Sequence, residues 1–136
     1  MITGINHVTL SVRDLQESFA FYTDLLGFRP RLRWPDGAYL TAGSVWLVLT
    51  VDSNVRAQEL PEYTHLAFAI EPSRFREYAQ RLRQAGAREW KSNSSEGESL
   101  YFLDPNGHKL ELHYSDLESR LADARERKWA DFEFFE

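Results

Sequence analysis

The sequence predicts an α+β fold of two similar halves, in which helices lie outside mainly antiparallel sheet. Two observations lead to this prediction. The same order of elements, a strand, then a helix, then further strands, occurs twice in the 136 residues. In addition, His7 and His65 occupy equivalent positions in the first strand of each half. We expect one domain of four segments, with a first module at 1–51, a polar linker at 52–62, a second module at 63–114 and a charged tail at 115–136.

The first module is expected to form a strand, a helix and two short strands. Alternation of polar and apolar residues over 5–12 predicts the first strand, with the apolar side chains on one face. Asp14 is a candidate N-cap for the helix that follows, and Gly27 is suited to end it. Short runs with aromatic residues predict the two later strands, at 38–42 and 45–50.

The second module repeats this order. Residues 63–70 alternate as a strand, and the helix that follows carries apolar residues at helical spacing and ends at Gly86. Two further strands, at 100–103 and 109–114, are separated by Asp104-Pro-Asn-Gly. That tetrapeptide suits a type I turn, because Asp favours the first position, Pro the second and Gly the fourth.

Composition narrows the classes of function. The chain has 16 Lys and Arg against 21 Asp and Glu, and this charge of −5 argues against a general binder of nucleic acid or anionic membranes. The absence of cysteine excludes disulfides, thiolate metal sites and a cysteine nucleophile. No apolar run has the length of a membrane span and the start does not read as a secretory signal, so we expect a cytoplasmic protein.

The tail at 115–136 differs from the rest, because half of its residues are charged. Leu117 and Leu121 form a weak helical stripe. A solvated helix explains this pattern, and so does a flap or dimer arm that covers a site.

Two histidines and one carboxylate form the first candidate site. His7 and His65 lie on the less apolar face of their strands, whereas Glu111 interrupts an apolar strand, where a lone carboxylate is costly unless paired or metal-bound. Such a set suits a divalent metal with open positions for substrate and water. Hydrogen-bonded strand histidines and an edge-exposed carboxylate are the structural alternative. His113 shares strand parity with Glu111 and is a reserve candidate, while His108 follows the turn and is less suited.

The second candidate site is the loop from Lys91 to Ser99, which contains several serines, an asparagine and a glycine. Hydroxyl and carbonyl oxygens suit a hard cation, while Lys91 and backbone N–H groups suit an oxyanion. Ser99 and Tyr101 share one strand face, so both can point into a cavity lined by that sheet. A solvated loop without a ligand is the alternative.

Several motifs resemble the vicinal oxygen chelate superfamily, which includes glyoxalases and bleomycin-resistance proteins. They are Asn6-His7-Val-Thr9, Phe21-Tyr-Thr-Asp-Leu-Leu-Gly-Phe28 and Tyr101-Phe-Leu-Asp-Pro-Asn-Gly-His-Lys-Leu-Glu111. The loop Trp90-Lys91-Ser-Asn93-Ser-Ser95-Glu-Gly97-Glu-Ser99 is similar, more specifically, to the fosfomycin-resistance glutathione transferases. The resemblance implies paired βαβββ modules with cupped sheets, in a homodimer whose sites draw residues from both chains.

The resemblance also implies which residues form the site. The implied manganese ligands are His7, His65 and Glu111, and the implied potassium-binding residues are Asn93, Ser95, Gly97 and Ser99. The residues implied to hold the phosphonate of fosfomycin are Thr9, Lys91, Ser95, Ser99, Tyr101 and Arg120, with Trp46 as a wall beside the substrate. Tyr39 is implied to help deprotonate the glutathione thiol, and joins Thr9, Lys91 and Arg120 in the catalytic set.

In the implied reaction, glutathione opens the epoxide of fosfomycin at a site that holds manganese and potassium. His7 of one subunit would meet His65 and Glu111 of the other. Three alternatives are a related enzyme that uses another thiol or water on the same drug, an iron-dependent ring-cleaving dioxygenase, and a metal-free protein that sequesters the drug. Ring cleavage would not need the cations of Lys91 and Arg120, and the metal-free alternative leaves Glu111 unexplained.

Overall fold

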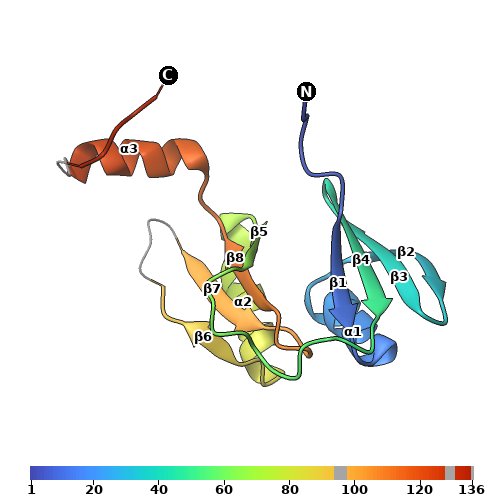
Figure 1. The fold of residues 1–136 in the computed structure, drawn as a ribbon. Helices are drawn as coiled ribbons and strands as arrows, with labels where there is room; N and C mark the ends of the chain where they lie inside the picture. The colour runs from blue at the N-terminus through green and yellow to red at the C-terminus, as the bar shows by residue number, and fades with distance from the viewer. Residues whose placement is uncertain (94–97, 128–130, 136) are drawn as a thin grey trace.

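The computed structural model describes residues 1–93, 98–127 and 131–135. It contains two four-stranded sheets, one from each half of the chain, with strand orders β1-β4-β3-β2 and β5-β8-β7-β6 (Figure 1). In each sheet the first and last strands of that half pair in parallel, and the other pairs are antiparallel. The predicted α+β fold with mainly antiparallel sheet is therefore confirmed.

The element bounds show the repetition. The first half contains β1 (Val8–Val12), α1 (Leu15–Ala20), the π-helical turn η1 (Phe21–Leu25), β2 (Arg29–Trp34), β3 (Gly37–Ala42) and β4 (Val45–Val51). The second half contains β5 (Leu66–Ala69), α2 (Pro72–Gln84), β6 (Glu89–Lys91), β7 (Ser99–Leu103) and β8 (Lys109–His113). The tail forms α3 (Leu117–Arg127). Residues 52–65, all of which are described, form neither helix nor strand between the two halves.

Strands β2 and β6, at the edges of their sheets, were not predicted from local patterning, although the βαβββ modules that the resemblance implies include a third strand after each helix. Strand β2 reads Arg-Pro-Arg-Leu-Arg-Trp, is mostly exposed, and shifts register between Pro30 and Leu32. Strand β6 has only three residues. Edge strands of this kind are short, charged or interrupted by proline, so they carry no apolar alternation that would reveal them.

The local signals for helix ends and the turn are confirmed. The carboxylate of Asp14 accepts a hydrogen bond from the backbone N–H of Glu17 at 3.2 Å, which caps α1. Gly27 follows the helical segment with φ of +75°, a conformation that favours glycine. The N–H of Gly107 donates to the carbonyl of Asp104 at 3.1 Å, as expected of the predicted turn.

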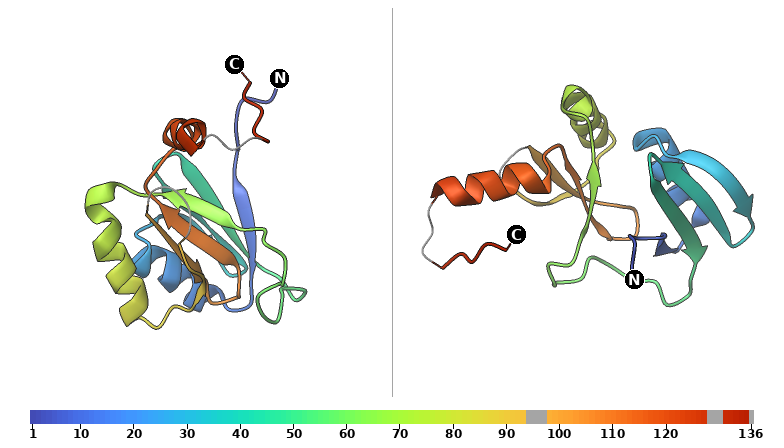
Figure 2. Two further views of the ribbon diagram at one scale, coloured as in Figure 1. Left: turned by 90° about the vertical axis from the view of Figure 1, so that its left-hand side faces the viewer. Right: turned by 90° about the horizontal axis from the view of Figure 1, so that it is seen from above.

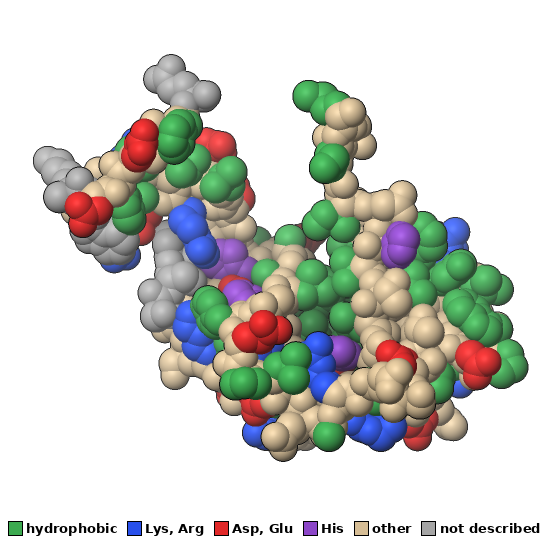
Figure 3. All heavy atoms as spheres, viewed as in Figure 1, with side chains coloured by type: hydrophobic (Ala, Val, Ile, Leu, Met, Phe, Trp, Pro, Cys, Tyr) green, Lys and Arg blue, Asp and Glu red, His purple; other side chains and the backbone are tan. Residues whose placement is uncertain are grey.

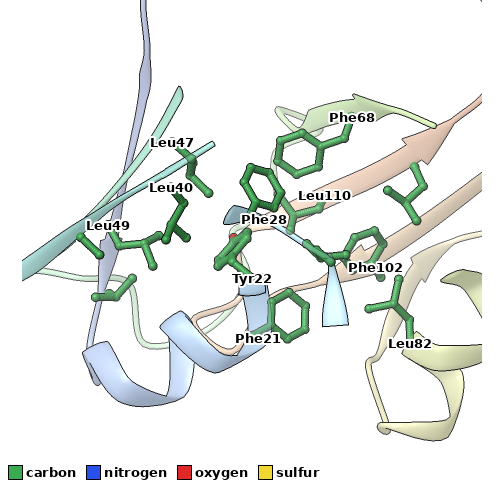
Figure 4. Packing of buried hydrophobic residues seen from close by; sticks show 14 of the residues in the cluster. Phe21, Tyr22, Phe28, Leu40, Leu47, Leu49, Phe68, Leu82, Phe102 and Leu110 are labelled. Atoms are coloured by element: carbon green, nitrogen blue, oxygen red, sulfur yellow. The ribbon is translucent and has the colours of Figure 1, made fainter. Parts of the chain in front are cut away.

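One hydrophobic core joins the two halves. Figure 4 shows Tyr22 and Phe28 between the leucines of the first sheet and the aromatic residues of the second. The ring of Phe28 lies 5.4 Å from that of Phe68, and the ring of Phe21 lies 6.3 Å from that of Phe102. The halves therefore pack on one another within a single chain.

Buried polar contacts add to this junction. The hydroxyl of Tyr22 donates to the carboxylate of Asp104 at 2.7 Å, and the amide of Asn106 donates to the hydroxyl of Ser18 at 2.9 Å. The other oxygen of Asp104 accepts the backbone N–H groups of Asn106 and His108, at 2.8 and 3.0 Å. The turn of the second half is thus bonded to the helical segment of the first.

The two sheets each bury one face in the core, and their other faces lie, only partly exposed, on a common side of the molecule. Figure 3 shows histidine side chains on both halves on that side, with Lys and Arg side chains near those of the second half. Helix α3 projects beyond the second sheet and has no buried residue (Figures 1 and 2), as expected of a solvated helix. None of the described helices has the length and apolar character needed to cross a membrane.

Candidate metal and anion site

The candidate site is built on the face of the second sheet that points away from the core. Pairing across its strands aligns Ala67 with Glu111, Glu111 with Tyr101 and Tyr101 with Lys91. Side chains of directly paired residues lie on the same face of a sheet. Strand pairing, with a register shift between Glu89 and Lys91, therefore brings a carboxylate, a phenol and an ammonium group into one row, with His65 just before β5.

Glu111 is buried, with 5% of its surface exposed, but it has hydrogen-bond partners. The hydroxyl of Ser99 donates to its Oε2 at 2.6 Å, and Nε2 of His65 lies 3.1 Å from its Oε1. The alternatives predicted from the sequence were a paired, a metal-bound or an edge-exposed carboxylate, and the burial of Glu111 contradicts the last of them. Both of its oxygens have a partner, Ser99 on Oε2 and His65 on Oε1.

The tautomer of His65 indicates what belongs between it and Glu111. Its Nδ1 lies 2.9 Å from the carbonyl oxygen of Tyr63, and a carbonyl can only accept, so Nδ1 carries the proton. In the neutral ring, Nε2 then presents a lone pair toward a carboxylate oxygen. Either a second proton or a cation must lie between the two atoms. An imidazole fixed by a carbonyl and facing a carboxylate is the donor arrangement that divalent metals prefer, so the residues fit a metal.

His7, at the start of the first sheet, has its ring nitrogens arranged as in His65. Its Nδ1 lies 2.7 Å from the side-chain oxygen of Asn6, which leaves Nε2 available, and its ring lies 4.8 Å from that of Trp46. Within one chain, however, the described residues form no group of three His, Cys, Asp or Glu side chains that could hold a metal ion. The structure thus joins His65 and Glu111 and places His7 apart from them, on the first sheet.

The first sheet has the same register as the second but different side chains. Pairing aligns Thr9 with Val48 and Val48 with Tyr39, so Val48 occupies the position that Glu111 has in the second sheet. Beside this row, the rings of Tyr39 and Trp46 lie 5.3 Å apart, and those of Trp34 and Tyr39 lie 5.2 Å apart. The first sheet therefore offers a histidine and an aromatic wall, and the carboxylate comes only from the second.

Two cationic side chains flank the candidate site. The ammonium of Lys91 donates to the hydroxyl of Tyr63 and lies 4.9 Å from the centre of the Tyr101 ring. The hydrogen bond to Tyr63 raises the pKa of Lys91, which keeps it charged. Arg120, from α3, lies 3.3 Å from Nε2 of His113. Both cations suit an anionic ligand next to Glu111, and α3 thus contributes to the site as well as being solvated.

The predicted potassium loop is only partly described. Asn93 and Ser99 lie at its two ends, whereas Ser95 and Gly97 fall outside the described residues. Ser99 is 8% exposed, and its hydroxyl is within hydrogen-bond distance of both Glu111 and His113. Ser99 is therefore in direct contact with the candidate metal ligand Glu111.

Sequence reasoning missed the contribution of Trp90. Its ring lies 5.3 Å from that of His65 and 5.1 Å from that of Tyr101, and its indole N–H donates to the carbonyl of Leu110 at 3.0 Å. No periodic signal marked it, because it lies on the unpredicted strand β6.

A separate cavity of about 640 Å³ lies between η1 and the turn after β7, and none of the predicted site residues lines it.

Comparison with known proteins agrees with the fold. Residues 4–112 match the family described as glyoxalase/bleomycin resistance protein/dioxygenase superfamily. The chain is 49% identical to glutathione transferase FosA of Serratia marcescens, over 98% of this chain and 96% of that protein. It is 38% identical to metallothiol transferase FosB of Shouchella clausii, over 90% and 87% of the two chains.

Solved structures show the same relationship. The fosfomycin resistance protein FosX of Listeria monocytogenes, as an E126Q mutant with Mn(II) and 1S,2S-dihydroxypropylphosphonic acid, aligns with a TM-score of 0.78 at 27% identity. That alignment covers 89% of this chain and 99% of FosX. A FosX from Mesorhizobium loti aligns with a TM-score of 0.74 at 30% identity, covering 89% and 99% of the two chains. This chain belongs to the glyoxalase/bleomycin resistance protein/dioxygenase superfamily and, within it, to the family of FosA, FosB and FosX.

Proposed function

We propose that this protein is a metal-dependent glutathione S-transferase that inactivates fosfomycin by opening its epoxide. The observation that carries the proposal is the group on the second sheet, where His65 and Glu111 lie next to the cations Lys91 and Arg120. That group suits a small anionic substrate held against a metal. The 49% identity to a glutathione transferase, against 38% to a metallothiol transferase, supports glutathione as the thiol.

The metal would be Mn²⁺, held by His7, His65 and Glu111, with His7 supplied by a second copy of the chain. A homodimer is part of the proposal because the two sheets of one chain keep His7 apart from the other ligands. When bound, the metal supplies a Lewis acid that lowers the free energy of negative charge on the departing epoxide oxygen.

The remaining residues would bind and orient the substrates. Lys91 and Arg120 neutralise the phosphonate, which reduces the repulsion between this dianion and an incoming thiolate. Thr9, Ser95, Ser99 and Tyr101 complete the phosphonate-binding set, and Trp46 forms a wall. Asn93, Ser95, Gly97 and Ser99 would bind K⁺ and add a further positive charge.

Tyr39, as its phenolate, would accept the thiol proton as glutathione approaches. The sulfur would then form a bond to the epoxide carbon next to phosphorus as the C–O bond breaks, and the ring oxygen would take up a proton from water. Because the chain has no cysteine, the thiol must come from outside the protein.

Turnover of fosfomycin tests the proposal directly. Purified protein with glutathione and Mn²⁺ is expected to form the glutathione adduct, faster with K⁺ than without it, and mass spectrometry identifies the product. Chelation should stop the reaction and Mn²⁺ should restore it, which also excludes a metal-free sequestering protein. A diol or another thiol adduct, with no glutathione adduct, would instead assign the reaction to one of the alternatives.

Substitution of Lys91 tests the anion site. The variant Lys91→Met is expected to lower kcat/KM for fosfomycin about tenfold to hundredfold, because a charge-assisted contact to the phosphonate is lost. Lys109→Met is the matched control, since the ammonium of Lys109 donates to the carbonyl of Glu62 and lies 5.2 Å from the Trp90 ring centre. Equal losses in the two variants would contradict the assignment of Lys91.

A further inference from the structure

A continuous line of hydrogen bonds runs behind Glu111. Oε2 of Glu111 lies 2.6 Å from the hydroxyl of Ser99, and that hydroxyl lies 2.5 Å from Nδ1 of His113. Nε2 of the same imidazole lies 3.3 Å from the guanidinium of Arg120. These contacts link the candidate metal ligand to the candidate anion-binding arginine through two intervening side chains.

The direction of each hydrogen bond follows from the chemistry of its ends. A guanidinium has donors only, so Arg120 donates and Nε2 of His113 must accept. The proton of the neutral imidazole then lies on Nδ1, which donates to Ser99. The ionised carboxylate of Glu111 only accepts, so the hydroxyl proton of Ser99 points toward it. The three hydrogen bonds therefore run in one direction, from Arg120 through His113 and Ser99 to Glu111.

Backbone geometry and burial keep this line in place. Ser99 and His113 are directly paired residues of β7 and β8, so the sheet register itself brings them together. The side chain of His113 is only 12% exposed, and Ser99 and Glu111 are more buried. In such surroundings a reversed hydroxyl would leave two acceptors facing each other, at a considerable cost in free energy.

We infer that His113 is a positioning residue, which acts on the metal site through Ser99 and Glu111. Its Nδ1–H fixes the hydroxyl of Ser99, and the hydroxyl holds Oε2 of Glu111. The other oxygen, Oε1, is then the one presented to the metal on the side of His65. The inference rests on the proposed metal-dependent function, and it adds a residue that the predicted metal, potassium and phosphonate sets do not contain.

Three substitutions of His113 distinguish positioning from simple packing. Asn can place an amide N–H near the position of Nδ1, Gln places its amide farther out, near Nε2, and Leu offers neither. Mn²⁺ affinity, measured by EPR without fosfomycin or glutathione, should stay within about threefold of wild type in His113→Asn. In His113→Gln and His113→Leu it should fall about tenfold to hundredfold, as is typical when a partner of a metal ligand is lost. His108→Gln, a buried histidine bonded to the carbonyl of Ser11, is the control and should leave the affinity unchanged.

NMR of the metal-free wild-type protein gives a second measurement that does not depend on any variant folding. The ¹⁵N shifts of His113 should be those of the Nδ1–H tautomer. An Nε2–H tautomer, or the same Mn²⁺ affinity in His113→Leu as in wild type, would overturn the inference. Because neither measurement uses fosfomycin, a protein that fails to turn over the drug but shows these results would contradict only the proposed function.

Discussion

Glu111→Gln is expected to abolish Mn²⁺-dependent turnover of fosfomycin while leaving the fold intact. An amide is a poorer metal ligand than a carboxylate. The metal, as a Lewis acid, stabilises the transition state by several kcal/mol. A loss of that size corresponds to a decrease in kcat/KM of about a thousandfold or more. The fold should persist because Gln can still accept from Ser99 and can donate an amide hydrogen to Nε2 of His65.

The control for this variant is Glu59→Gln. Glu59 is a carboxylate paired with Arg88 at 3.0 Å, outside the candidate site. That variant should bind Mn²⁺ and turn over fosfomycin as the wild type does. Undiminished metal affinity in Glu111→Gln, measured by EPR on protein with a native circular dichroism spectrum, would show that Glu111 is not a ligand.

Asp104→Ala is expected to lower the free energy of unfolding by about 3–5 kcal/mol, the range typical of breaking a buried charged network. The carboxylate of Asp104 accepts from the hydroxyl of Tyr22 and from the backbone N–H groups of Asn106 and His108. With Ala in its place, three donors at the junction of the two halves lose their acceptor. Urea unfolding measures the effect, and a loss of less than about 1 kcal/mol would contradict this account.

Tyr22→Phe is the matched partner of this variant. It removes one donor but leaves Asp104 bonded to two backbone N–H groups, so the expected loss is smaller, about 1 kcal/mol. Burial, and then the charge of Asp104, raises the pKa of Tyr22 well above 10. Since the unfolded phenol ionises near pH 10 and the folded one does not, wild-type stability should fall as the pH rises above about 10. That part of the alkaline decrease should disappear in Tyr22→Phe.

Local rules were sufficient for much of the fold. The cap at Asp14, the positive φ at Gly27 and the turn at Asp104 depend on neighbouring residues, so the sequence revealed them. The central strands alternate because one face packs against the core. The edge strands β2 and β6 were missed because their pairing depends on a neighbouring strand rather than on their own pattern.

The candidate site, like the fold, was only partly predictable from the sequence. Strand parity placed Glu111 and His113 on one face, and the internal repeat paired His7 with His65. The sequence did not indicate that Trp90 packs on His65 or that α3 brings Arg120 to His113. These contacts join segments that no local periodicity relates.

The sequence by itself determined the two-module α+β architecture, the face of each strand and the types of ligand available to a metal. Only the tertiary structure decided that Ser99 engages one oxygen of Glu111 and that Ser99 also contacts His113. The physical reason is that alternation and helix-end signals arise within a few residues of chain. Hydrogen-bond direction and the separation of the two sheets arise from packing between segments that are distant in sequence.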